Sequence, residues 1–175
     1  MIVLNDIIIE KMKEEDIEQV AKIFIDSWRI AYKDIIDETF LQNLCLEEKI
    51  EKLKKEYKVK EYTIARDKEI NEIIGVTRFG KRLDELDRFI EYDGEIYALY
   101  VKPELLRKKM GSKLLLYAKE RLKEQGSHKM IIWCLKENQP SRKFYESMGG
   151  IWLGEKMRNI GGKDYPLVGY GYEIT

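Results

Sequence analysis

The stretch that decides the fold is residues 95–126, EIYALYVKPELLRKKMGSKLLLYAKERLKEQG. Its first part, Ile96–Val101, is rich in apolar and aromatic residues and predicts a β-strand, which Pro103 cannot continue in a paired position. Its last part has apolar residues at four-residue steps from Met110 to Leu122, with charged residues between them, and predicts an amphipathic helix. Gly126 is a suitable stop for that helix. The stretch therefore predicts a strand, a short loop and a helix.

A basic loop, Arg107–Lys109, joins the strand to the helix, and Gly111-Ser112 opens the helix. The first N–H groups of a helix lack internal partners and lie at the positive end of the helix dipole. A glycine there lets the backbone approach a ligand closely. These features predict a pyrophosphate-binding loop. The alternative interpretation of the same residues is an ordinary exposed loop with three solvated basic side chains. The loop lacks the spaced glycines of a P-loop and has too few glycines for a Rossmann fingerprint.

Outward from this stretch, hydrophobic periodicity predicts the elements of the rest of the chain. The predicted strands are Ile7–Met12, Tyr62–Ala65, Ile73–Phe79, Met130–Leu135, Ile151–Met157 and Leu167–Ile174. The predicted helices run from Asp16 to about Tyr32, from Phe40 to Leu44, from Leu46 to Tyr57 and from Pro140 to Met148. The charged run Lys81–Glu91 predicts a loop or a short helix. This order predicts an α/β fold in which one mixed central sheet has helices on both faces, as a single domain over residues 1–175.

The composition limits the partners that the chain can have. Lys and Arg together number 32, as do Asp and Glu, so the formal net charge is zero and nucleic acid is not expected as the main partner. Cys45 and Cys134 share no short motif, and the lone His128 has no metal-ligand spacing with other residues, so neither a disulfide framework nor a metal site is expected. No apolar run reaches membrane-spanning length, and the N-terminus lacks the features of a signal peptide. We therefore expect a soluble, cytoplasmic protein with no membrane partner.

Three groups of residues carry a resemblance to a known family. They are Gly94–Pro103 leading into Met110–Leu115, the later positions Trp133–Leu135, Glu137, Asn138, Ser141 and Phe144–Gly149, and the early segment Trp28–Tyr32. The first group resembles the acetyl-CoA-binding motif of the GNAT superfamily of N-acetyltransferases. The second is similar to the later strand and helix of that family, and the third to a segment found in many of its bacterial members. The family loop commonly reads Arg/Gln-x-x-Gly-x-Gly/Ala, where this chain has Leu106 at the Arg/Gln position and Lys109 at the first glycine.

The resemblance implies that acetyl-CoA is the co-substrate and that no metal takes part. The residues at its cofactor-binding positions are Leu99, Tyr100, Val101, Leu106, Arg107, Lys108, Lys109, Met110, Gly111, Ser112, Asn138 and Ser141. In the family, the strand before the loop splays from its neighbour, and its backbone holds the pantetheine arm. The N–H near Tyr100 would then polarise the thioester carbonyl. Plain sheet pairing is the alternative for these strand residues, and a cap for the following helix is the alternative for Asn138.

The resemblance also implies an acid and acceptor residues, and the reaction itself requires a base, because the attacking amine must be neutral. Tyr145 matches the family tyrosine that can protonate the leaving thiolate, although an aromatic side chain packed under the sheet would also fit. Glu95 is the candidate base, since an apolar cleft would raise the pKa of its carboxyl group, and a solvated strand-end glutamate is the equal alternative. Strict alternation places Glu95 on the opposite face of the strand from Tyr100. Trp28 and Tyr32 match one wall of the acceptor pocket, although Trp28 also completes the apolar stripe of its helix.

We therefore expect an N-acetyltransferase that moves an acetyl group from acetyl-CoA to a primary amine by direct attack, without a covalent enzyme intermediate. The acceptor is expected to be a small-molecule amine or a peptide or protein amine, which a fold resemblance does not specify. The departures at Leu106 and Lys109 leave a non-catalytic acyl-CoA-binding or sensing module as the alternative function. A homodimer formed through the C-terminal strands is a further possible assembly.

Overall fold

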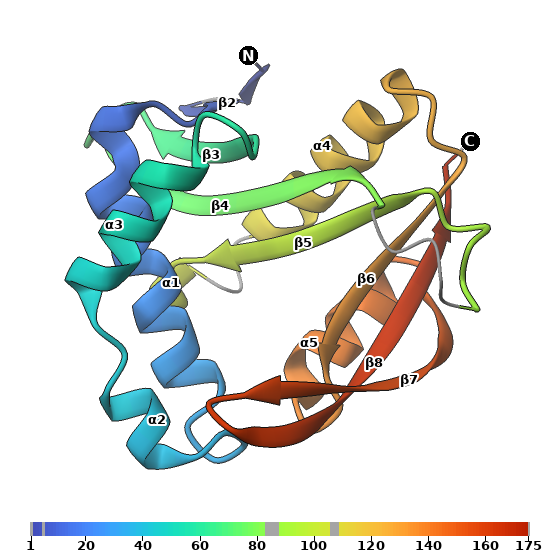
Figure 1. Cartoon of the computed structure of the whole chain (residues 1–175). Coiled ribbons are helices and arrows are strands. Elements are labelled where there is room, and N and C mark those ends of the chain that lie inside the picture. Colours follow the sequence, from blue (N-terminus) through green and yellow to red (C-terminus); the bar gives the residue numbers. More distant parts are fainter. Residues whose placement is uncertain (1, 5, 83–87, 106–108, 175) are drawn as a thin grey trace.

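The computed structural model describes residues 2–4, 6–82, 88–105 and 109–174. Its strands are β1 (Ile2–Leu4), β2 (Ile7–Lys11), β3 (Tyr62–Asp67), β4 (Glu72–Lys81), β5 (Gly94–Val101), β6 (Lys129–Leu135), β7 (Ile151–Ile160) and β8 (Lys163–Glu173). Its helices are α1 (Ile17–Ala31), α2 (Glu38–Gln42), α3 (Leu46–Glu56), α4 (Met110–Glu124) and α5 (Gln139–Ser147), with 3₁₀ turns at Glu14–Asp16 and Pro103–Leu105. The strands form one sheet in the order β1-β2-β3-β4-β5-β6-β8-β7 (Figure 1), in which β5 and β6 are parallel and the other neighbours are antiparallel. The mixed α/β sheet expected from the sequence is confirmed.

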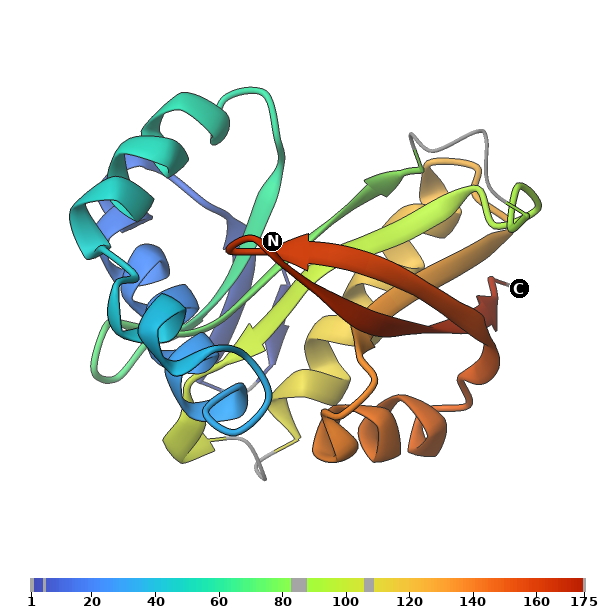
Figure 2. The ribbon, with the colours of Figure 1, turned by 60° about the horizontal axis from the view of Figure 1, so that its bottom comes forward.

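Helices cover both faces of this sheet, as expected (Figures 1 and 2). On one face, Phe24 of α1 and Leu53 of α3 are buried in one cluster with Ile64 of β3. On the other face, Leu115 of α4 is buried in one cluster with Ile132 of β6, and α5 joins the same cluster. Each helix thus removes its apolar stripe from water, which stabilises the fold by roughly 25 cal/mol for each Å² of apolar surface buried.

The order of the elements matches the sequence prediction, with local differences. An additional strand, β1, pairs with β2 ahead of the first predicted strand. The last two strands are longer than predicted, because β7 and β8 continue to a tight turn at Gly161-Gly162. Both glycines have positive φ, 61° and 88°, a region that favours glycine, so this pair sets the position of the hairpin turn. Within the predicted loop at 81–91, residues 83–87 lie outside the described residues.

A β-bulge in β5 changes the direction in which its side chains point. Arg78 of β4 pairs with Ala98, while the next residue of β4 pairs with Ile96, so Tyr97 is the extra residue of the bulge. As a result, Ile96 is buried with α4, whereas Ala98 and Tyr100 pack with α1. The strict alternation expected for this strand is wrong, because the extra residue reverses the two faces beyond it.

Lys49 is a charged residue within the packing of α3 against α1. Its Nζ atom lies 3.9 Å from the centroid of the Phe24 ring. Burial, and after it the positive charge of Lys52, lower the pKa of Lys49 from 10.5 to about 8. Because the pKa is lower in the folded state, the charged form opposes folding. This cost is fully present below pH 8 and disappears as the pH rises from 8 to 10.5, since the native state loses its proton first.

We expect Lys49→Met to raise the free energy of unfolding by about 1–2 kcal/mol at neutral pH, because it keeps an apolar stem over Phe24 and removes the buried charge. The gain should shrink toward zero near pH 10.5, and chemical denaturation at both pH values measures it. Lys55→Met, on the exposed side of the same helix, is the matched control and should show no such gain. An equal gain at neutral and alkaline pH would contradict the explanation by a buried charge.

Candidate active site

β5 and β6 separate after a short paired segment. They pair at three positions, from Gly94 with Met130 to Ile96 with Ile132. Beyond these positions, β5 pairs only with β4 and β6 only with β8, and Figure 1 shows the two strands diverging. We call this divergence the splay. Within the described residues, it leaves the backbone of Ala98–Val101 without a strand partner on the β6 side, so the structure has a splay where plain sheet pairing was the alternative.

Contacts with β4 and α4 hold the free part of β5 in place. The bulge at Tyr97 increases the local twist of the strand. The buried hydroxyl of Thr77 in β4 donates a hydrogen bond of 2.9 Å to the carbonyl of Ala98. Gly75 of β4 allows α4 to approach closely, since a Cβ atom there would lie 2.8 Å from Cδ1 of Leu114. This segment of β5 is therefore held along its β4 edge and by packing on its faces, while its β6 edge stays open.

Three tyrosines from three elements meet at the splay: Tyr32 at the end of α1, Tyr100 of β5 and Tyr145 of α5. We call them the tyrosine cluster. Burial raises the pKa of all three phenols, and the proximity of Tyr100 and Tyr145 raises the pKa of Tyr32 further. The indole N–H of Trp28 donates a hydrogen bond of 3.0 Å to the Tyr100 hydroxyl and partly opposes the rise there. All three phenols therefore remain protonated at neutral pH.

Packing holds Tyr145 tightly in α5, with 7% of its surface exposed. Its carbonyl accepts hydrogen bonds from the Tyr172 hydroxyl at 2.8 Å and from the Gly150 N–H at 2.9 Å. Its ring lies 5.4 Å from the ring of Phe144. After burial, Cys134 of β6 contributes most to the raised pKa of Tyr145, so the phenol lies close to the part of β6 that no longer pairs with β5. Tyr145 is thus a packed residue whose phenol stays protonated and is influenced by Cys134 of β6 and Tyr100 of β5, the two strands that diverge at the splay.

Asn138 is the residue that begins α5. Its Oδ1 atom accepts a hydrogen bond of 3.3 Å from the N–H of Ser141, and only 6% of the residue is exposed. Asn138 therefore caps α5, which was the alternative to cofactor binding for this residue. Among the residues that the structure describes, the side-chain NH₂ group of Asn138 has no hydrogen-bond partner, so it can still donate to a ligand.

The residue before the first turn of α4 has a left-handed backbone conformation. Lys109 precedes the helix with φ 60° and ψ 12°, in the left-handed region that favours glycine, and it stands where the family loop has its first glycine. Gly111 lets this turn lie against α5, because a Cβ atom there would be 3.3 Å from Cζ of Phe144. Met110 is buried beneath the turn. The predicted loop residues Leu106–Lys108 lie outside the described residues.

Glu95 lies in the paired segment of β5 and not in the splay. Gly94 and Ile96 face α4, so Glu95 points to the opposite face, which it shares with Tyr100. The expected placement of Glu95 and Tyr100 on opposite faces is wrong because of the bulge. Its carboxylate is ion-paired with Arg82, whose Nε atom lies 3.6 Å from Oε2, and the two side chains are only 14% and 3% exposed. Roughly 15 Å of strand separates Glu95 from Tyr100.

Trp28 and Tyr32 lie together at the C-terminal end of α1. Their ring centroids are 5.1 Å apart, and Trp28 is 6.4 Å from the ring of Phe40. Both are half-buried in a cluster with the α2 region and the β7–β8 hairpin. Trp28 packs as expected and also bonds Tyr100 through its indole N–H. The structure therefore brings both predicted acceptor residues to the tyrosine cluster.

Sequence reasoning missed three basic residues on the face of the sheet that α1 covers. Arg82 lies within a uniformly charged run, so no local pattern distinguishes it from its neighbours. Lys156 and Arg158 alternate along β7, and that alternation within a predicted strand is the signal that could have found them. The charge of Arg158 lowers the pKa of Tyr100, which places Arg158 near the tyrosine cluster.

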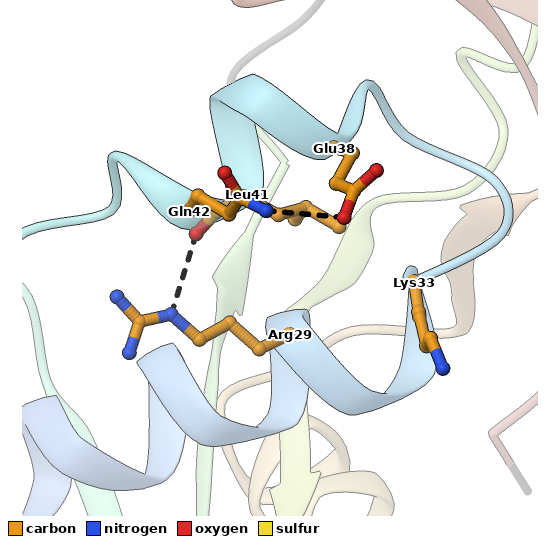
Figure 3. A pocket seen from close by; sticks show the side chains of 5 residues that line it. All are labelled: Arg29, Lys33, Glu38, Leu41 and Gln42. Atoms are coloured by element: carbon orange, nitrogen blue, oxygen red, sulfur yellow. Dashed lines mark hydrogen bonds between the residues drawn. The ribbon is translucent and has the colours of Figure 1, made fainter.

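A surface pocket lies apart from the splay, between α1 and α2 (Figure 3). It is lined by Arg29, Lys33, Glu38, Leu41 and Gln42. Its polar groups are largely satisfied internally, since Arg29 donates to the carbonyl of Leu41 at 3.3 Å and Gln42 donates to Glu38 at 3.0 Å. No residue of the predicted site lines it, so we place the active site at the splay.

The described residues contain no group of three His, Cys, Asp or Glu side chains that could hold a metal ion. None of the helices among them is both long enough and apolar enough to cross a membrane.

The comparisons with known proteins agree with this geometry. Residues 17–150 match the model of the acetyltransferase (GNAT) family. The chain therefore belongs to the GNAT family of acetyltransferases. It is 33% identical over 164 residues to the uncharacterized N-acetyltransferase YuaI of Bacillus subtilis, which covers 94% of this chain and 91% of that protein. It is 29% identical over 146 residues to a spermidine N(1)-acetyltransferase of Thermoplasma acidophilum, which covers 81% of this chain and 86% of that protein.

Among solved structures, the PaiA N-acetyltransferase of T. acidophilum in complex with coenzyme A has the same fold. It superimposes with a TM-score of 0.68 at 24% identity, covering 93% of this chain and 97% of that one. Family membership confirms the expected enzyme class, an N-acetyltransferase, and the expected donor, because enzymes of this family take the acetyl group from acetyl-CoA.

The left-handed backbone of Lys109 leads to a stability prediction. Lys109→Gly should raise the free energy of unfolding by up to about 1 kcal/mol, because relief of backbone strain exceeds the entropy that glycine loses on folding. Lys109→Val should lower it by about 1–2 kcal/mol, since a β-branched residue tolerates this conformation poorly. Lys113→Gly, inside the same helix, is the control and should lower the free energy of unfolding by about 1 kcal/mol. Chemical denaturation measures the free energy of unfolding of all three variants. An equal decrease for Lys109→Gly and Lys113→Gly would contradict the prediction.

Proposed function

We propose that this chain transfers an acetyl group from acetyl-CoA to a primary amine by direct attack, without a covalent enzyme intermediate. The observation that carries the proposal is the splay, because it opens the β6-side edge of Ala98–Val101 beside the tyrosine cluster. The extended arm of an acyl-CoA can bind a free strand edge much as another strand does. The relative named as a spermidine N-acetyltransferase and the neighbour solved with coenzyme A support the proposal.

The two parts of the cofactor would bind at two parts of this site. The backbone of Leu99, Tyr100 and Val101 would hold the pantetheine arm, and Asn138 and Ser141 would contact it from α5. The N–H groups of Lys109–Ser112 lie at the positive end of a 15-residue helix and would bind the pyrophosphate, with Leu106, Arg107 and Lys108 completing the loop.

Tyr145 would act as the general acid. When bound, acetyl-CoA supplies the thioester carbonyl that the acceptor nitrogen attacks. The backbone N–H near Tyr100 would stabilise the negative charge that develops on that carbonyl oxygen. As the carbon–sulfur bond breaks, Tyr145 would donate its phenolic proton to the sulfur, leaving free CoA and the N-acetylated amine. Burial holds the pKa of Tyr145 well above its usual value, so the proton is present throughout the working pH range.

Glu95 would act as the base through ordered water. A primary amine is mostly protonated at neutral pH and must lose a proton before it can attack. Glu95 shares a face with Tyr100 but lies too far along β5 for direct contact, so the proton would pass through water. The ion pair with Arg82 would hold the carboxylate in position. After the attack the nitrogen loses a second proton, which would pass through water to the Tyr145 phenolate and restore it, while Glu95 would release the first proton to the solvent.

The acceptor would enter beside Trp28 and Tyr32 and would be a small-molecule or peptide amine. Their aromatic surfaces would form one wall of its site. The homodimer through the C-terminal strands remains a prediction. The observation that favours it is the edge strand β7, which exposes 66% of Ile151 and 53% of Trp152.

Tyr145→Phe tests the proposed acid. We expect kcat to fall by about 100-fold with little change in the KM for acetyl-CoA, because the ring still packs while the proton donor is lost. Thiol release with a panel of amines measures this, and Tyr117→Phe on α4 is the matched control. Acetyl-CoA at 100 times its Kd should stabilise wild type and Tyr145→Phe equally, by about 2.7 kcal/mol. Stabilisation of the wild type without turnover of any amine would instead indicate a non-catalytic acyl-CoA-binding module.

Glu95→Gln tests the proposed base. At neutral pH we expect kcat/KM to fall by about 10- to 100-fold, because less of the acceptor reaches the neutral form. The loss should diminish as the pH approaches the pKa of the acceptor amine, which then loses its proton without help. The pH dependence of kcat/KM for wild type and variant measures this difference. A loss that is the same at every pH would mean that Glu95 has only a structural role with Arg82.

A further inference from the structure

Two basic side chains of β7, Lys156 and Arg158, share one face of the sheet. The Nζ atom of Lys156 lies 4.1 Å from the centroid of the Trp133 ring of β6. Arg158 is two residues further along the same strand, opposite Tyr165 of β8, so it points to the same side. Ile160 follows on that face and is buried in the cluster that includes Trp133. We call Lys156 and Arg158 the basic pair.

The basic pair lies on the acceptor side of the sheet. Trp133 packs in one cluster with Trp28 and Tyr32, the residues at the end of α1. The next residue of β6, Cys134, packs instead with Tyr145 on the α5 side. The face of β6 that carries Trp133 is therefore the face that meets α1.

No described carboxylate neutralises the basic pair. Among the described residues, neither Lys156 nor Arg158 has a carboxylate oxygen within 4.0 Å. At the turn of the same hairpin, by contrast, Lys163 pairs with Asp37 at 2.6 Å. Two cations that share one face, one of them over an aromatic ring and neither with a described counter-ion, form a place where an anion gains free energy by binding.

We propose that the acceptor amine also carries a carboxylate, as a free amino acid does, and that Arg158 and Lys156 bind this group. The inference rests on the proposed acetyl transfer and specifies its acceptor. A guanidinium forms two parallel hydrogen bonds with a carboxylate, and an ammonium adds a compact charge. Trp133 offers apolar surface for the carbon chain of the acceptor. Anchoring the carboxylate on β7 leaves the amine free to approach the tyrosine cluster.

A polyamine fits this face poorly. Spermidine is a polycation at neutral pH, so the basic pair repels it. Its recognition would need free carboxylates, but several carboxylates of the surrounding elements are already ion-paired. These ion pairs are Asp37–Lys163, Glu155–Lys136 and Glu95–Arg82. We therefore expect this chain to differ in its acceptor from the spermidine acetyltransferase to which it is similar.

Wild-type specificity provides the first test. With acetyl-CoA in excess, kcat/KM is measured for α- and ω-amino acids, for the carboxamides of the same compounds and for spermidine. We expect the best amino acid to exceed its own carboxamide by ~10-fold or more and spermidine to be the poorest acceptor. A preference for the carboxamide or for spermidine would overturn the inference and leave acetyl transfer intact. If no amine is acetylated, acetyl transfer itself fails, and the inference fails with it.

Variants of the basic pair provide the second test. We expect Arg158→Gln and Lys156→Met each to raise the KM for the amino acid by ~10- to 100-fold, with kcat nearly unchanged and little effect on the carboxamide. Arg158→Lys should recover part of the loss. Lys123→Met, exposed near the far end of α4, is the matched control and should behave as wild type. Stabilisation by acetyl-CoA verifies that each variant is folded. An equal rise in KM for the amino acid and for its carboxamide would show that the basic pair does not bind a carboxylate.

Discussion

The separation of β5 from β6 after three residue pairs is the constraint on which the site depends. A longer parallel pair would satisfy the backbone groups of both strands and leave no room for a ligand. Instead, the bulge at Tyr97 and the hydroxyl of Thr77 hold β5 to β4, while β6 stays with β8. A free backbone edge is unfavourable by itself, and for that reason a bound extended ligand can gain hydrogen bonds there.

The splay also collects residues that are far apart in the sequence. Tyr32 comes from α1 and Tyr100 from β5, while Tyr145 comes from α5 on the opposite face of the sheet. The three hydroxyls share a poorly solvated region, which keeps them neutral and makes them proton donors rather than charges. On the same side of the sheet, Glu95 and Arg82 neutralise each other, whereas Lys156 and Arg158 have no described counter-ion, so the proposals assign proton donation and anion binding to different residues.

Much of this architecture could be predicted from local patterns. The periodicity in residues 95–126 specified the strand, the turn and the helix, since apolar spacing reflects which side of an element is buried. The cap formed by Asn138 could also be anticipated, because capping depends on residues three positions apart. The direction of the β5 side chains could not be predicted from local patterns, because the bulge at Tyr97 depends on how β4 pairs with β5. The ion-pair partner of Glu95 could not be predicted either, because Arg82 is one of many charged residues in the run Lys81–Glu91.

The sequence by itself therefore determined the order of the elements, the mixed sheet and the family, because these follow from spacing and motif along one stretch of chain. The tertiary structure decided where β5 leaves β6, that Glu95 and Tyr100 share a face, and that Lys156 lies over Trp133 on the same face as Arg158, neither with a described counter-ion. The physical reason is that side-chain direction, burial and charge pairing are properties of strand register and packing. Both are set by contacts between residues that are distant in the chain.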